Sequence, residues 1–261
     1  MKRIVLTMVV CAVFLLLPLT QVYSLDIKNQ KVNITVSQSF VTRYIWRGLD
    51  LYPENDPSYQ PSLDIAFEDL VAGIDVSLNI WGGLPIGSGH ESSTEADYAL
   101  TLSRDFEKIN VSAGYVYFDY LKANRFSDVN ELWVSASLFK IPVLPVDVSF
   151  DVLAAYEYKA TEGGPDNGWY YSWGFSTTVP IPKCGLTQDG QGLDASVANW
   201  GNDGASDLKP SKLYATEFNL GTTYTFGSVS VTPGFTYVWN HEDEINPDNE
   251  IVGMIDISYS F

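Results

Sequence analysis

Carboxylate side chains recur on the polar face of a two-residue alternation that runs through this 261-residue sequence. In a strand, such alternate positions point to one side of the sheet, while the apolar residues between them point to the other. Reading that polar face gives Asp64, Glu68, Asp75, Asp97, Glu131, Asp147, Asp151, Asp194, Glu217 and Asp256. Basic residues on the same face are few: Lys31 and Arg43, with Arg47 near the rim. Because so few bases cannot pair with every acid and carboxylate rings attract cations, the pattern predicts an aqueous interior that favours cations.

A second arrangement, His90-Glu91-Ser92, could support nucleophilic catalysis. A serine nucleophile needs an adjacent imidazole base, which a third side chain orients. The pair lies in a segment rich in glycine and serine, residues 87–93, and the sequence identifies no Asn or Asp partner. An outer-membrane lipid hydrolase using His90 and Ser92 is therefore an alternative. The main prediction is a protein without catalytic residues, cofactors or metal sites.

The elements that must position these side chains are strands. Val32 to Trp46 sets the pattern, with mostly apolar residues at even positions and polar residues at the odd positions from 31 to 39. Twelve such segments follow one another, most of them long enough to cross a membrane, which takes about 9–11 residues. An open sheet edge cannot survive in lipid. The sequence thus predicts an all-β, transmembrane, antiparallel up-and-down β-barrel of about twelve strands, or of ten if the weak segment 193–200 is not a membrane strand.

The connectors support this architecture because long and short ones alternate, as they do in outer-membrane barrels. Aromatic residues near segment ends are typical of the rings that mark the two membrane interfaces. These residues are Tyr44, Trp46, Trp81, Tyr117, Tyr120, Trp169, Trp200, Tyr237 and Trp239.

The two ends of the chain indicate the compartment. Residues 1–24 have a charged start, an apolar run and a small residue at position 24, which is typical of a cleaved signal peptide. The barrel domain is then 25–261. The final strand alternates without error and ends on an aromatic residue, a pattern that resembles the C-terminal signal of bacterial outer-membrane barrels. We therefore expect Tyr259 and Phe261 to be read by the barrel assembly machinery.

The negative net charge of the chain limits which partners it can bind. The chain carries a formal net charge of −17, whereas nucleic-acid binding needs a basic face. Aromatic residues make up 14% of the sequence, which argues against a disordered acidic chain. The expected partners are outer-membrane lipid and lipopolysaccharide, together with small cations or solutes. The oligomeric state does not follow from the sequence.

One stretch resembles a known family. Phe40-Val41-Thr42-Arg43-Tyr44-Ile45-Trp46-Arg47-Gly48-Leu49 is similar to an N-terminal signature of the TorF-like porins, Gram-negative outer-membrane β-barrels. The match covers roughly 30 residues, through Asp56-Pro57 and the following strand. The resemblance implies a pore in the outer membrane and supplies no catalytic residues. The preferred function is a small cation-favouring channel, and a closed barrel that acts through acidic external loops is a further alternative.

Overall fold

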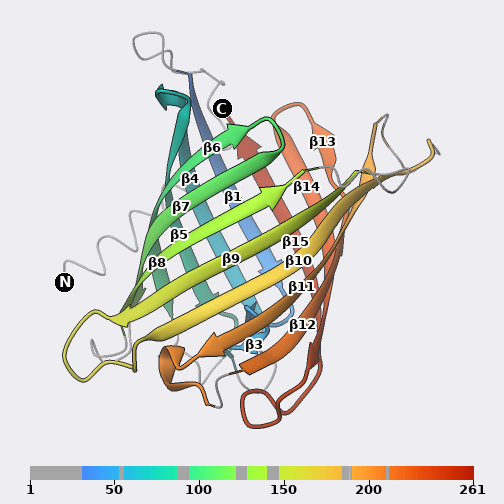
Figure 1. The fold of residues 1–261 in the computed structure, drawn as a ribbon. Helices are drawn as coiled ribbons and strands as arrows, with labels where there is room; N and C mark the ends of the chain where they lie inside the picture. Colours follow the sequence, from blue (N-terminus) through green and yellow to red (C-terminus); the bar gives the residue numbers. More distant parts are fainter. Residues whose placement is uncertain are drawn as a thin grey trace.

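The computed structural model describes residues 31–52, 56–87, 94–121, 128–139, 147–183, 188, 190–209 and 212–261. Twelve long strands dominate the fold (Figure 1). They are β1 (Val32–Val41), β4 (Ser58–Val71), β5 (Ile74–Pro85), β6 (Glu95–Phe106), β7 (Ile109–Tyr120), β8 (Val129–Leu138), β9 (Val148–Lys159), β10 (Gly168–Pro180), β11 (Gly192–Asp203), β12 (Lys212–Gly221), β14 (Val229–Asn240) and β15 (Glu250–Ser260). Three short strands, β2 (Ile45–Trp46), β3 (Leu49–Asp50) and β13 (Tyr224–Phe226), and one 3₁₀ turn (Ala205–Asp207) complete the regular structure.

The long strands form a closed barrel in which neighbours pair antiparallel. Pairing of β1 with β15 closes the ring, with Val36 opposite Tyr259, and β12 pairs directly with β14. The predicted fold class is confirmed. The ten-stranded alternative is wrong, because β11 pairs along most of its length with both β10 and β12. Its small residues weakened the sequence signal without weakening its hydrogen-bond ladder.

Side-chain alternation separates an apolar outer surface from a polar inner one. On β8, Leu132 and Val134 expose 52% and 55% of their surface to the outside. Glu131 on the same strand points inward and exposes 1%. A soluble protein rarely exposes contiguous apolar surface on this scale. The described residues contain no helix that is long and apolar enough to cross a membrane.

The two ends of the barrel differ in their connectors. Residues 72–73 and 107–108 form tight turns at one end. At the other end lie long connectors such as residues 160–167 and 241–249 (Figure 1). We call these the short-turn end and the long-connector end. Two connectors at the short-turn end are long as well: residues 139–147 between β8 and β9, and residues 181–191 between β10 and β11.

In the connector between β10 and β11, the Gln188 side chain forms hydrogen bonds with the backbone of β13. The Gln188 amide donates to the Thr225 carbonyl at 2.9 Å and accepts from the Thr225 backbone N–H at 2.8 Å. Gln188 thereby makes the two hydrogen bonds that a neighbouring strand residue would make to β13. Nearby, the Gln191 amide donates to the Thr222 hydroxyl at 2.8 Å.

The first strand is shorter than the sequence predicted. The alternation from Val32 to Trp46 indicated one strand, but β1 ends at Val41. The chain then turns into the barrel, so that Tyr44 is buried with 6% of its surface exposed. Alternation could not reveal this bend, because apolar residues suit a packed interior as well as a lipid-facing surface.

Candidate functional site

The connector after β1 folds back into the barrel as a hairpin. Trp46 of β2 pairs with Leu49 of β3, and the turn between them is Arg47-Gly48. Both turn residues have positive φ, 53° and 79°, as a two-residue type I′ turn requires. We call residues 42–52 the inner hairpin. Figure 1 shows β3 at the long-connector end.

Aromatic contacts join the inner hairpin to different sides of the barrel wall. The Tyr44 ring lies 5.5 Å from that of Trp81 on β5. The Trp46 ring lies 5.8 Å from Phe118 on β7 and 5.2 Å from Tyr170 on β10, edge to face in both cases. Edge-to-face pairs contribute about 0.5–1.5 kcal/mol beyond area burial. The hairpin is therefore packed across the interior at this end.

The hairpin gives the barrel an internal hydrophobic core. The buried members come from the hairpin, β9, β10, β12, β14 and the 3₁₀ turn: Leu49, Ala155, Tyr170, Ala205, Tyr214, Ala215 and Val238. Burial raises the pKa of Tyr44 well above its usual value, and the nearby carboxylates of Glu95 and Asp97 raise it further. Tyr44 thus stays protonated and donates to Glu95 Oε2 at 3.1 Å.

The hairpin turn fits tightly against β12. A Cβ atom added at Gly48 would lie 2.5 Å from the Cβ of Ala215, so only glycine fits there in this conformation. The Tyr214 hydroxyl donates to the Arg47 carbonyl at 2.7 Å. From the connector after β14, the Asn246 amide donates to the Gly48 carbonyl at 3.5 Å.

The Arg47 side chain occupies a cage of one carboxylate and three aromatic rings. Its two terminal nitrogens donate to the two oxygens of Glu131 at 2.6 and 2.7 Å. Its guanidinium carbon lies 4.3 Å from the ring centroid of Trp46, 5.0 Å from Tyr170 and 5.7 Å from Trp200. These distances are typical of cation–π contact. Only 10% of the Arg47 side chain is exposed.

Further carboxylates surround this cage. Glu157 and Glu217 lie within electrostatic reach of Arg47. Glu95 and Asp97 face the same half of the interior from β6. The inner hairpin therefore places one arginine among five acidic side chains. Within the described part of the chain, no group of three or more His, Cys, Asp or Glu side chains is arranged to hold a metal ion.

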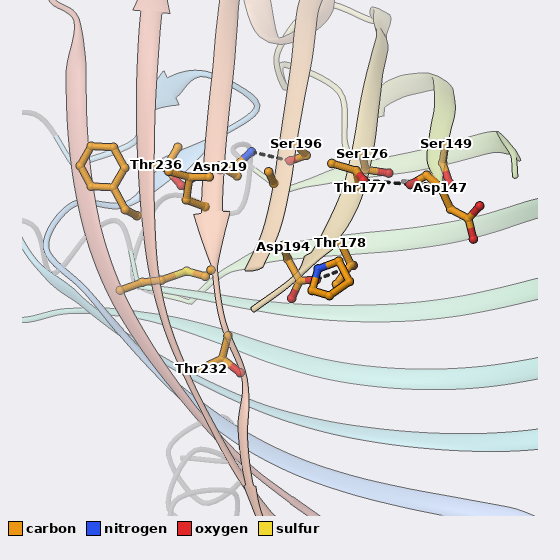
Figure 2. Close-up of a pocket in the computed structure, with 16 residues that line it drawn as sticks. Asp147, Ser149, Ser176, Thr177, Thr178, Asp194, Ser196, Asn219, Thr232 and Thr236 are labelled. Carbon is orange, nitrogen blue, oxygen red and sulfur yellow. Dashed lines mark hydrogen bonds between the residues drawn. The ribbon is translucent and has the colours of Figure 1, made fainter. Parts of the chain in front are cut away.

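The short-turn half of the interior contains a cavity. Its volume is about 840 Å³, and it is lined largely by hydroxyl and carboxylate side chains (Figure 2). Thr178 donates to Asp194 at 2.6 Å, and Ser176 donates to Asp151 at 2.8 Å. In the same way Ser39 donates to Asp256 at 2.6 Å. Hydroxyl donors stabilise these carboxylates without cancelling their charge.

The structure separates the predicted interior residues into two groups. Asp97, Glu131 and Glu217 lie in the half that holds the inner hairpin, together with Arg43, which forms an ion pair with Glu250. The other acidic residues lie from the barrel centre toward the short-turn end: Asp64, Asp75, Asp147, Asp151, Asp194 and Asp256. Glu68, at that same end, forms an ion pair with Lys31 at 2.6 Å. That the predicted interior residues line a pore remains a prediction.

No protein-family model and no curated protein matches the sequence. Among solved structures, LpxR from Salmonella typhimurium has a TM-score of 0.52 at 12% identity, covering 86% of this chain and 99% of its own. The NanC porin has a TM-score of 0.50 at 11% identity, covering 87% of this chain and 98% of its own.

The chain has the fold of an outer-membrane β-barrel. At such low identities the likeness shows the fold alone. It does not decide between the channel and the hydrolase. His90 and Ser92 lie outside the described residues, as does the predicted signal peptide, so the structure places neither.

Sequence reasoning missed several interior residues that the same alternation could have found. Glu95 lies two positions before Asp97 on β6, and Glu157 lies six positions after Asp151 on β9, so each shares the inner face. Five of the nine residues assigned to the interfacial rings instead face the interior: Tyr44, Trp46, Trp81, Tyr120 and Trp200. Arg47, predicted near the rim, lies inside as well.

Proposed function

We propose that this protein is a narrow, cation-favouring channel of the outer membrane. The observation that carries the proposal is the charge of the interior beside the inner hairpin, where Arg47 is surrounded by Glu95, Asp97, Glu131, Glu157 and Glu217. One guanidinium offsets one of these carboxylates. The excess negative charge would lower the energy of a cation in the constriction and raise that of an anion.

The rest of the interior supports the same direction of selectivity. Asp151, Asp194 and Asp256 are held by hydroxyl groups, so a cation entering from the short-turn end meets carboxylates before it reaches the hairpin. A cavity of about 840 Å³ provides an aqueous vestibule for hydrated ions. The inner hairpin makes the opposite half the narrow part, so we expect a small conductance.

The family assignment and the cellular setting belong to the same proposal. The signature around Arg43 to Leu49 resembles the TorF-like porins, and its Arg47-Gly48 pair forms the hairpin turn. An apolar outer surface suits outer-membrane lipid, and the long connectors would face lipopolysaccharide outside the cell. Residues 1–24 would direct export, and the last strand with Tyr259 and Phe261 would be read by the assembly machinery.

A closed barrel is the second candidate, and the inner hairpin is the observation that favours it. Leu49, Tyr214 and Ala215 pack into one buried cluster across the interior. If the inner hairpin stays packed in the barrel interior, no ion path opens. The protein would then act through its long connectors, which would bind partners outside the cell. This candidate predicts folded protein that inserts into membranes without conducting ions.

Recordings in planar bilayers separate the two candidates. Refolded protein in a tenfold KCl gradient is expected to give small current steps with a reversal potential of cation-selective sign. Folding is checked independently by heat-modifiable migration in gels. Folded protein without conductance would favour the closed barrel, and a reversal potential of anion-selective sign would refute the proposed function.

A further inference from the structure

The cage around Arg47 is built from two separable parts. Trp46 belongs to the inner hairpin, but Glu131, Tyr170 and Trp200 belong to β8, β10 and β11 of the barrel wall. The wall part would remain in place if the hairpin moved. The Arg47 side chain therefore occupies a site on the barrel wall that a separate ligand could also occupy.

The wall part of the cage matches a guanidinium group in shape and in charge. Glu131 presents both carboxylate oxygens to the two terminal nitrogens of Arg47, at 2.6 and 2.7 Å. This paired geometry needs a planar fork of donors, which an ammonium group lacks. The rings of Tyr170 and Trp200 add cation–π contacts.

Two acidic side chains besides Glu131 lie near Arg47. Glu157 and Glu217 interact electrostatically with Arg47, while its hydrogen-bonded ion pair is with Glu131. A small cation that displaced Arg47 would therefore find three carboxylates within reach. A solute with a second positive group would interact with them better than Arg47 does.

A cavity inside the barrel adjoins Arg47 and Glu131 of the cage. This cavity of about 450 Å³ is lined by Arg47, Glu131, Asp97 and Trp81, among other residues. Small-molecule sites commonly enclose about 300–1,000 Å³. A solute in this cavity would touch the guanidinium of Arg47 and the carboxylate that holds it.

We propose that Glu131, Tyr170 and Trp200 form a binding site for small solutes carrying a guanidinium group, which Arg47 occupies as an internal ligand. A free guanidinium solute competes with Arg47 for Glu131 and so weakens the attachment of the inner hairpin. The binding site itself stands independently of ion conduction. The consequence that solute raises the current rests on the proposed channel function.

Direct binding tests the site. Arg47→Asn removes the guanidinium and retains a type I′ turn, because Asn-Gly is the preferred pair for such turns. Agmatine and putrescine share a four-carbon chain and an amine, but only agmatine carries a guanidinium. In calorimetry on detergent-folded protein, Arg47→Asn is expected to bind agmatine at least tenfold more tightly than putrescine. Adding Glu131→Gln should abolish that difference.

Arg43→Asn supplies the matched control. It breaks the partly buried ion pair of Arg43 with Glu250, for which the described residues show no stacked ring. Agmatine should bind this variant as weakly as it binds the wild type. Equal binding of agmatine and putrescine by folded Arg47→Asn would overturn the site, and so would equal agmatine binding by the two arginine variants. If Arg47→Asn does not fold, Arg47→Gly provides the same empty cage.

Conductance distinguishes this inference from the proposed function. Millimolar agmatine should increase the wild-type current severalfold, whereas putrescine should not. Selective agmatine binding to a barrel that never conducts would uphold the site and refute the channel. A cation-selective channel whose Arg47→Asn variant does not discriminate between the two solutes would uphold the channel and refute the site.

Discussion

Replacing Gly48 by alanine should release the inner hairpin. In the packed conformation the new Cβ would lie 2.5 Å from the Cβ of Ala215, far inside normal contact distance. Forcing an extra methyl group into a packed site costs about 1–3 kcal/mol. The backbone adds to this, because φ of Gly48 is 79° and an L-residue pays about 1–2 kcal/mol for a left-handed conformation.

Together these terms disfavour the packed hairpin by about 2–5 kcal/mol. Since 1.4 kcal/mol corresponds to a factor of ten, the ratio of released to packed hairpin should rise between about 30-fold and about 4,000-fold. Single-channel recordings should show this as a longer open time and a larger mean conductance. Gel mobility before and after heating verifies that the variant is folded.

The reciprocal change provides the decisive control. Ala215→Gly removes the atom that the new methyl group would strike, which leaves only the backbone cost of about 1–2 kcal/mol. Gly48→Ala combined with Ala215→Gly should therefore return most of the way to the wild-type current. A folded Gly48→Ala variant with unchanged conductance would refute the reasoning. If the double variant has the same conductance as Gly48→Ala alone, the contact with Ala215 is not what releases the hairpin.

Three further outcomes follow from the fold and the charge. Gln188→Met removes both hydrogen bonds to Thr225 and should destabilise the barrel by about 1–2 kcal/mol, measured as a lower urea midpoint; an unchanged midpoint would show that the pair contributes nothing. Deleting Phe261 removes its N–H bond to the Ile34 carbonyl, 2.8 Å long, and its ring contact with Tyr259, so less heat-modifiable protein should reach the outer membrane; normal levels would refute an assembly role. Raising KCl from about 0.1 to about 1 M shortens the Debye length from about 10 to about 3 Å and should weaken cation selectivity; a constant permeability ratio would contradict selection by fixed charge.

The barrel could be predicted from the sequence because its determinants are local. Alternation from Tyr98 to Leu102 or from Ile251 to Phe261 reports directly which side chains face lipid. In a closed sheet this also fixes which side chains face inward. The carboxylates on β6 and β9 follow from the same parity, including Glu95 and Glu157, which were not among the predicted residues.

The inner hairpin could not be predicted, because its position depends on contacts between residues distant in sequence. Arg47 meets Glu131 across 84 positions, and Tyr214 bonds to the Arg47 carbonyl across 167. The local signal at Tyr44 and Trp46 was equally consistent with a membrane interface, where aromatic rings are also favoured. No local pattern around Arg47-Gly48 specifies that the chain turns into the barrel at this point.

The most direct test of the account is the reversal potential of the Gly48→Ala channel in a tenfold KCl gradient. Once the hairpin is released it no longer blocks the interior. The charge of the barrel interior then determines which ions pass. This variant is expected to select K⁺ over Cl⁻, and the selectivity should fall when Glu157 and Glu217 are both replaced by Gln. A potential near zero, or one of anion-selective sign, from folded and conducting protein would contradict the account.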